Sequence, residues 1–138
     1  MEQPMKERRR FPRLKIELFV RYKILGKMEQ QGDGQTKNIS AGGICLVARE
    51  KLQLGTKVAV EMKFPDSVNP VLAVGRVVWS DESNLGPSIA GHPRFDNGIE
   101  FEQISVLDRN RIIEHVKFAQ DKTKGHDWQI GIVTDIAR

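Results

Sequence analysis

Residues 15–24 read KIELFVRYKI, and the alternation within them sets the expected architecture. Apolar side chains stand at every second position, at Ile16, Leu18, Val20, Tyr22 and Ile24. A period of two is typical of a strand with one face in a core and the other in solvent. The segment therefore predicts a half-buried β-strand near the start of a mainly β domain.

Similar patterns predict five further strands. They cover residues 36–39, 44–48, 58–64, 71–79 and 95–101. The strand over 71–79 is rich in β-branched residues, so we expect it to be more buried than the others. Residues 26–34 are rich in glycine and predict a turn, and residues 80–94, which carry Ser, Asn, Gly and Pro, predict an exposed loop.

The pattern changes to a helical period near residue 105. Ser105 and Asp108 resemble a capping box with Asp in place of Glu or Gln, and they open a predicted helix over 105–122. Two rows at helical spacing predict an amphipathic helix packed on a sheet. The rows are Val106, Arg109, Ile113 and Val116, and Ile112, Val116 and Ala119. Six strands and one helix predict a small antiparallel barrel or a curled sheet.

Composition divides the chain into three regions. We expect a flexible, arginine-rich arm over 1–13, the barrel and helix over 14–122, and a C-terminal tail over 123–138. A charged linker at 121–127 leads into alternating apolar residues at 128–133 in the tail, which predict an extra strand. An exposed edge that recruits a partner strand is the alternative, and the oligomeric state stays open.

The charge of the chain is concentrated at one end. The 22 Lys and Arg residues exceed the 18 Asp and Glu residues by four. The first 15 residues hold six basic and two acidic side chains, and the remainder is balanced at 16 of each. A nucleic-acid platform spreads positive charge over its surface, so this distribution disfavours that class.

Several other classes are disfavoured by what the sequence contains. No segment approaches the roughly 18 apolar residues that a membrane span needs, and the N-terminus lacks the apolar core of a signal peptide. One cysteine cannot form an intramolecular disulfide, so we expect a cytoplasmic location. The soft ligands are scattered, so we expect no metal site; they are Cys45, His92, His115 and His126. Ser40 has no histidine near it in sequence, so we expect no catalytic residues and no enzyme.

The arm concentrates four guanidinium groups around one aromatic ring. It reads Arg8-Arg9-Arg10-Phe11-Pro12-Arg13. A guanidinium presents a planar fork of donors that fits phosphate oxygens or the edge of guanine. Pro12 favours an extended Phe11, which we expect to anchor the arm against the domain. A solvated tail that binds polyanions indiscriminately is the alternative.

A second polar group lies in residues 38–43, which read NISAGG between two predicted strands. Two strands that flank a glycine pair predict a hairpin with a positive φ in its turn. The side chains of Asn38 and Ser40 can bond the backbone of this turn. They can equally face a ligand, with Gly43 allowing the main chain to approach it closely.

Together, the two groups resemble the PilZ domain, the bacterial receptor module for cyclic di-GMP (c-di-GMP). The first motif is Arg-x-x-x-Arg and the second is Asn-x-Ser-x-x-Gly, and they match Arg9, Arg13, Asn38, Ser40 and Gly43. Residues 75–79 and 98–101 are similar to downstream strands of the family. The resemblance covers residues 7–118.

This resemblance implies a six-stranded antiparallel β-barrel with a C-terminal α-helix, and a ligand on the outer barrel surface. The implied site residues are Arg8, Arg9, Arg10, Arg13, Asn38, Ser40, Gly43 and Gly98. By the family's roles, Arg9 and Arg13 bind guanine and phosphate, and Asn38 and Ser40 contact a base or a phosphate. Gly43 is the close-packed turn residue.

The implied function is a c-di-GMP receptor or adaptor that acts on an unidentified protein partner. Ordering of the arm on binding is the expected signal, and no cofactor is expected beside the ligand. Arg8 resembles family variants that bind an intercalated pair of ligands. Two alternatives stay open: a PilZ-type adaptor that binds no nucleotide, and a small barrel that binds single-stranded nucleic acid.

Overall fold

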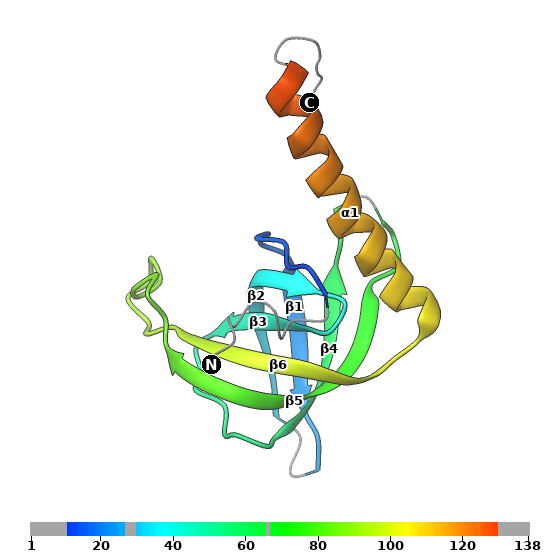
Figure 1. Ribbon diagram of the computed structural model, residues 1–138. Helices are drawn as coiled ribbons and strands as arrows, with labels where there is room; N and C mark the ends of the chain where they lie inside the picture. The colour runs from blue at the N-terminus through cyan, green and yellow to red at the C-terminus, as the bar shows by residue number, and fades with distance from the viewer. Residues whose placement is uncertain (1–10, 27–29, 66, 130–138) are drawn as a thin grey trace, which may run out of the picture.

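A computed structural model of the chain describes residues 11–26, 30–65 and 67–129. Within them, six antiparallel strands close into a barrel in the order β1-β2-β3-β6-β5-β4, and one helix crosses it (Figure 1). The elements are β1 (Phe19–Ile24), β2 (Gln30–Ser40), β3 (Gly43–Ala48), β4 (Lys57–Lys63), β5 (Val71–Glu82), β6 (Phe95–Ile104) and α1 (Val106–Gln129). This architecture confirms the predicted mainly β barrel with a C-terminal helix.

The barrel core is formed by the side chains that the alternating pattern turns inward. Val20 of β1 lies opposite Met62 of β4, and Val58 and Val71 occupy neighbouring inward positions. All four side chains are fully buried. Burying a side chain of this size contributes roughly 1.5–3 kcal/mol each, so the alternation is the main determinant of the fold.

The first predicted strand is shorter than expected, because β1 begins only at Phe19. The residues before Phe19 are instead joined to β2 by hydrogen bonds to one of its residues, Thr36. The Thr36 N–H donates to the Leu18 carbonyl at 2.9 Å, and its hydroxyl accepts from the Leu18 N–H at 2.9 Å. The same hydroxyl donates to the Ile16 carbonyl at 2.6 Å. One buried threonine therefore replaces the regular ladder.

The predicted turn over 26–34 is wrong for its second half, since β2 already begins at Gln30. Gly32 and Gly34 lie within that strand, opposite Tyr22 and Val20. A Cβ on Gly32 would lie 2.5 Å from the ring of Tyr22. The glycines therefore mark close packing within a strand rather than a turn.

The predicted hairpin between β2 and β3 is present, with Ser40 paired to Gly43. Its predicted positive φ is wrong for the glycine pair, since the glycines with positive φ in the described residues are Gly26, Gly55, Gly86 and Gly91. Gly43 is needed instead because a Cβ there would collide with the backbone oxygen of Ile99 on β6.

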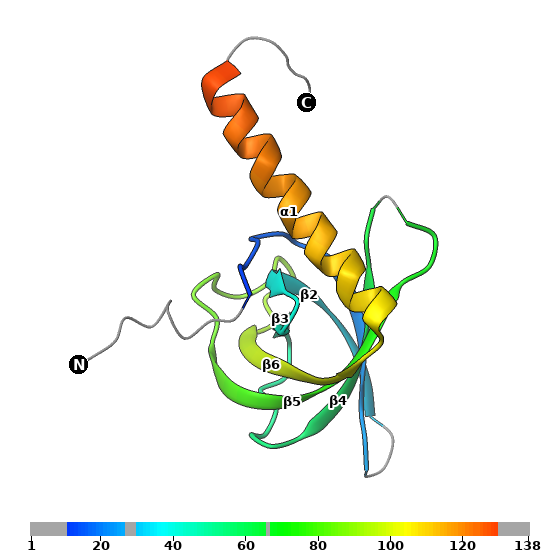
Figure 2. The same cartoon turned by 45° about the vertical axis from the view of Figure 1, so that its right-hand side comes forward.

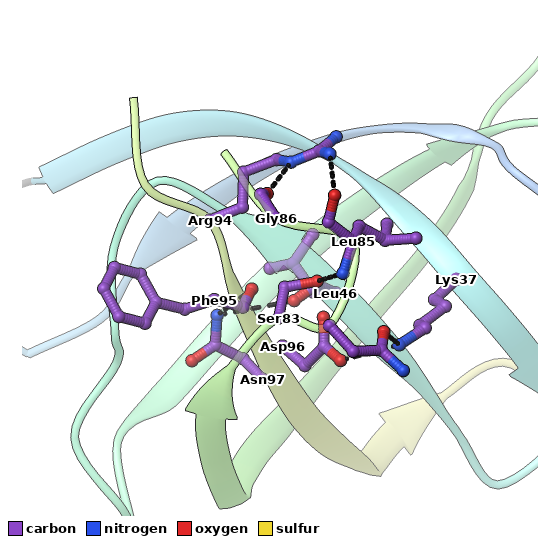
Figure 3. A network of polar contacts seen from close by, with 10 residues as sticks. Lys37, Leu46, Ser83, Leu85, Gly86, Arg94, Phe95, Asp96 and Asn97 are labelled. Carbon is purple, nitrogen blue, oxygen red and sulfur yellow. Dashed lines mark hydrogen bonds and ion pairs between the residues drawn. The ribbon is translucent and has the colours of Figure 1, made fainter. Parts of the chain in front are cut away.

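The predicted loop over 80–94 is shortened, because β5 extends to Glu82. Its remainder is fixed by hydrogen bonds rather than left open (Figure 3). The Arg94 guanidinium donates to the carbonyls of Gly86 at 2.9 Å and Leu85 at 3.0 Å. The Leu85 N–H donates to the Ser83 hydroxyl at 3.2 Å. These contacts hold the loop against the start of β6.

A buried amide ties the same end of the barrel together. Asn97 is fully buried, and its amide donates to the carbonyls of Leu46 at 3.4 Å and Glu50 at 3.1 Å. Its oxygen accepts from the Leu52 N–H at 2.9 Å and the Ser80 hydroxyl at 2.6 Å. Because each contact satisfies a polar group away from water, Asn97 fixes the chain after β3 to β5 and β6.

The helix begins as predicted, with Ser105 as its N-cap. The Ser105 hydroxyl accepts from the Asp108 N–H at 3.0 Å. The Asp108 carboxylate makes a different contact from the one that a capping box predicts. It accepts from the Leu72 N–H on β5 at 3.2 Å and pairs with Arg111 at 2.9 Å. The helix start is therefore attached to the barrel wall.

The packing of α1 agrees with only one of the two predicted rows. Ile112 and Val116 are buried, whereas Val106 and Ile113 are exposed. The helix also continues to Gln129 instead of ending near 122, and it extends beyond the barrel (Figure 2). The prediction of a linker at 121–127 is therefore wrong, and so is the prediction of a strand for residues 128 and 129, because both segments belong to the helix. Residues 130–133, where the strand was predicted to continue, lie outside the described residues. No helix in the described residues is long and apolar enough to cross a membrane.

Candidate functional site

The barrel register places the motif residues on two neighbouring rungs of the outer wall. On the first rung, Asn38 of β2 lies opposite Cys45 of β3, which lies opposite Gly98 of β6. Trp79 of β5 completes this rung opposite Gly98. The four residues come from four strands, so only the closed fold brings them together.

The second rung carries the rest of the second motif. Ser40 of β2 pairs with Gly43 of β3, and Gly43 pairs with Glu100 of β6. Glu100 in turn lies opposite Arg76 of β5, and their side chains form an ion pair at 3.3 Å. The structure thus brings together all the predicted site residues that lie on the strands.

A cavity of about 520 Å³ lies over the two rungs. This volume is within the range of small-molecule sites. Its walls include five of the predicted site residues, namely Arg13, Asn38, Ser40, Gly43 and Gly98. The predicted residues Arg8, Arg9 and Arg10 lie outside the described residues.

The base of the arm is attached directly beside this cavity. Leu14 forms an isolated antiparallel bridge with Ile39, through two hydrogen bonds of 2.8 and 2.9 Å. Because Ile39 lies between Asn38 and Ser40, the bridge places the neighbouring Arg13 next to the second motif. The Arg13 side chain is exposed and lines the cavity.

Phe11 anchors the arm, as its sequence context predicts. The ring packs against the core at the hairpin, where a Cβ on Gly42 would lie 3.2 Å from it. On another side, the Arg109 guanidinium of α1 lies 5.9 Å from the ring centroid, a cation–π distance. Phe11 therefore joins the arm to both the β2–β3 hairpin and the helix.

The two polar side chains of the second motif differ in what they already bind. The Ser40 hydroxyl accepts the Gly42 N–H at 3.1 Å and so supports the turn. The Asn38 amide makes no side-chain hydrogen bond to any residue that the structure describes. Asn38 therefore lines the cavity with its donors and acceptor unpaired among the described residues, whereas Ser40 has a structural contact as well.

The floor of the cavity is neutral. Cys45 is almost fully buried between Asn38 and Gly98. Burial raises the pKa of its thiol to about 11, and the nearby Asp96 carboxylate adds to this effect. The thiol is therefore protonated at neutral pH and presents a small, uncharged surface.

Trp79 is a site residue that the sequence analysis missed. The sequence predicts that its strand is buried, but the side chains of Val78 and Trp79 are exposed by 42% and 41%. The register between β5 and β6 shifts between Val77 and Trp79, which turns two successive side chains outward. The indole lies over Gly98, where any Cβ would collide with it. Glycine at 98 therefore makes room for the ring.

Glu100, which lines the cavity, belongs to a network of paired charges on the outer wall. Arg76 pairs with Glu100 at 3.3 Å and with Glu102 at 3.2 Å, and Lys57 pairs with Glu102 at 2.8 Å. The hydrogen bond from Lys57 holds the pKa of Glu102 below its usual value. These groups neutralise one another, so the arm side of the cavity is the side with available positive charge.

A larger groove of about 960 Å³ lies on the outer wall of the barrel near the start of α1. None of the predicted site residues lines it, but Arg109 lines both this groove and the smaller cavity. Elsewhere in the described residues, no three His, Cys, Asp or Glu side chains stand together as a metal site would require.

Comparison with known families agrees with the geometry of the two rungs. A sequence model of the PilZ domain matches residues 7–118. The chain belongs to the PilZ domain family. This membership confirms the resemblance drawn from the two motifs. No curated protein sequence matches the chain.

Solved PilZ proteins share the fold at low sequence identity. Bacillus subtilis MotI/DgrA, an inhibitor of motility, is 20% identical with a TM-score of 0.64 over 83% of this chain. The PilZ domain of Escherichia coli YcgR, solved with c-di-GMP, is 15% identical with a TM-score of 0.61 over 85% of this chain and 98% of that domain. The K. pneumonia MrkH–c-di-GMP complex is 13% identical with a TM-score of 0.57 over 84% of this chain. The chain spans 52% of the MotI/DgrA chain and 54% of the MrkH chain.

Proposed function

We propose that this PilZ domain binds c-di-GMP in the cavity over the two rungs and acts as a receptor rather than as an enzyme. The observation that carries the proposal is the register that aligns Asn38, Cys45, Gly98 and Trp79 beside the base of the arm. The YcgR domain and MrkH, which share this fold, were solved with c-di-GMP, and this supports the choice of ligand.

The chemistry of the cavity matches the ligand's two phosphates and two guanine bases. Arg13 offers a donor fork to a phosphate or to the O6 and N7 atoms of guanine. The available Asn38 amide can bond a base edge, and the exposed Trp79 indole provides a stacking surface for a base. The thiol of Cys45 on the cavity floor is neutral, so it does not repel the phosphates of the ligand.

The arm completes the site in this proposal. Arg10 and Arg9 lie one and two residues before Phe11, which is fixed at the cavity edge. Since each residue spans at most about 3.6 Å, their side chains are within reach of a ligand that lies beside Arg13. Binding then orders the arm, and the ordered arm presents a changed surface to a protein partner.

Titration calorimetry with c-di-GMP tests this function. We expect micromolar or tighter binding, and a loss of at least tenfold in affinity in each of Arg9→Ala and Arg13→Ala. Arg49→Ala is a matched control, because Arg49 is exposed and lines none of the cavities described. Unchanged affinity in both arm variants would refute the assignment.

The ligands in the same experiment distinguish the alternatives. Linear GMP and cyclic di-AMP should bind far more weakly, because neither offers two guanine edges on a ring closed by two phosphodiester groups. A single-stranded oligonucleotide that bound instead, with affinity falling steeply as salt rises, would favour a nucleic-acid function. If Arg8 supports a ligand pair, the stoichiometry should be near two and fall toward one in Arg8→Leu.

A further inference from the structure

Helix α1 carries a cation at the mouth of the cavity that neither motif contains. Arg109 lies in the first turn of the helix, where its N–H donates to the Ser105 carbonyl at 2.9 Å. Its side chain is exposed and lines the same cavity as Asn38 and Gly43. The helix therefore contributes a guanidinium to the site from the side that faces the arm.

The donors of Arg109 are not committed to a carboxylate in the described part of the chain. The adjacent Asp108 carboxylate is occupied by the Leu72 N–H and by Arg111. Arg76, which lies opposite Glu100 in the barrel register, is held by Glu100 and Glu102. The recorded contact of the Arg109 guanidinium is the Phe11 ring at 5.9 Å.

That contact leaves the guanidinium free to bind an anion. A cation–π contact uses the face of the guanidinium or its charge, whereas a phosphate takes its N–H donors in a charge-assisted, two-pronged hydrogen bond. The second interaction is the stronger at a partly exposed position. A phosphate in the cavity would therefore bind Arg109 without breaking any ion pair among the residues that the structure describes.

We propose that Arg109 is a phosphate-binding residue that α1 contributes to the ligand site. The inference rests on the proposed c-di-GMP function and adds to it a second cation, which comes from the helix, beside Arg13. The ligand is then held by guanidinium groups from both the arm and the helix. Since Arg109 also lines the 960 Å³ groove, ligand binding changes the wall of that groove.

Calorimetry on the full chain tests the role of Arg109. We expect Arg109→Gln to weaken c-di-GMP binding by about tenfold or more, because it removes a charge-assisted hydrogen bond. Arg109→Lys should lie between Arg109→Gln and the unchanged protein, since it keeps the charge and loses the fork. Lys117→Gln is the matched control, an exposed cation on the same helix outside both cavities, and should change affinity by less than about twofold.

A double-mutant cycle separates a direct contact from an effect through Phe11. If Arg109 acts only by holding the ring, Arg109→Gln should have no further effect in a Phe11→Leu background. If Arg109 binds the phosphate, the loss should persist there. Persistence of the loss supports the proposal, and its disappearance overturns it.

The outcomes also distinguish this proposal from the function on which it rests. Wild-type affinity in Arg109→Gln, together with lost binding in Arg13→Ala, overturns the Arg109 assignment alone. Absence of c-di-GMP binding in the unchanged protein overturns both proposals. Thermal unfolding of each variant confirms that the affinities are compared between folded proteins.

Discussion

At the scale of single residues, two glycines of the site are required for different reasons. A Cβ on Gly43 would collide with the backbone oxygen of Ile99, whereas a Cβ on Gly98 would collide with the indole of Trp79. The backbone of a closed barrel cannot move aside, but an exposed indole can adopt another rotamer. The same substitution should therefore have different consequences at the two positions.

We expect Gly43→Ala to lower the free energy of unfolding by about 1–3 kcal/mol, as overpacking does. Gly98→Ala should cost less than about 1 kcal/mol of stability, because the rotamer change relieves the collision. It should instead weaken c-di-GMP binding, because the displaced Trp79 no longer offers its face to a base. Urea unfolding and calorimetry measure the two effects. Equal losses of stability in both variants would contradict this explanation.

The buried thiol of Cys45 predicts a pH dependence of stability. Burial raises its pKa from 9.0 to about 11, so the folded protein favours the neutral thiol. The unfolded chain ionises first as the pH rises, and the free energy of unfolding therefore falls between about pH 9 and pH 11. The pKa of Tyr22 is also raised, by burial and by its hydrogen bond to Glu50, and adds a slope of the same sign.

Urea unfolding at a series of alkaline pH values measures this slope. We expect Cys45 to account for up to about 2 kcal/mol of the loss, and Cys45→Ala to remove that part while the Tyr22 part remains. Below pH 8 the slope of the variant should match that of the unchanged protein. A Cys45→Ala protein with the full alkaline slope would show that another group is responsible.

At the scale of the elements, a cluster of polar contacts fastens α1 to the barrel. Asp108 accepts from the Leu72 N–H at 3.2 Å and pairs with Arg111 at 2.9 Å. Arg111 also donates to the Ser67 hydroxyl and the Asn69 carbonyl, in the connection between β4 and β5. The helix start is therefore held by side chains as well as by the buried Ile112.

Substitution of Arg111 tests how much this cluster contributes. Arg111→Ala leaves the Asp108 carboxylate without its cation, so we expect the free energy of unfolding to fall by about 1–3 kcal/mol in urea. Lys117→Ala removes a cation from an exposed position of the same helix and should change it by less than about 0.5 kcal/mol. If the two variants are equally stable, Ile112 and Val116 alone hold the helix.

The elements that the sequence predicted well are those whose signal is local. The alternation of β1 and the Ser105 cap depend on neighbouring residues, and both are found in the structure. The bulge beside Trp79 depends on the pairing of β5 with β6, which no local period reveals. For the same reason Gly32 resembled a turn residue, although it makes room for Tyr22 on another strand.

The site was predictable to the extent that its motifs are contiguous. Asn38, Ser40 and Gly43 lie within one hairpin, and their spacing alone places them on one face. Trp79 and Arg109 reach the cavity from β5 and α1, so their part in it follows only from barrel closure and from the packing of the helix. Neither the position of Trp79 nor that of Arg109 in the sequence indicates that the side chain lines the cavity.

At the scale of the whole molecule, we expect the barrel to determine stability and the arm to determine ligand binding. The core side chains begin at Leu18, and the bridge between Leu14 and Ile39 closes the barrel end beside the cavity. Both sets of contacts are made by residues that follow Phe11, so we expect neither to depend on the arginines before it. In the proposed function they serve the ligand, so stability and binding should respond independently to their removal.

Deletion of residues 1–10 tests this independence. We expect the melting temperature to stay within about 3 °C of the full chain, because the core and the Leu14 bridge remain. We expect affinity for c-di-GMP to fall at least about 100-fold, since the deletion removes Arg8, Arg9 and Arg10 together. In the full chain, hydrogen exchange over residues 1–10 should slow on addition of the ligand and be unchanged by linear GMP. Retained affinity in the shortened chain, or exchange that the ligand does not alter, would show that the arm does not carry the signal and that the cavity binds through Arg13 and the helix alone.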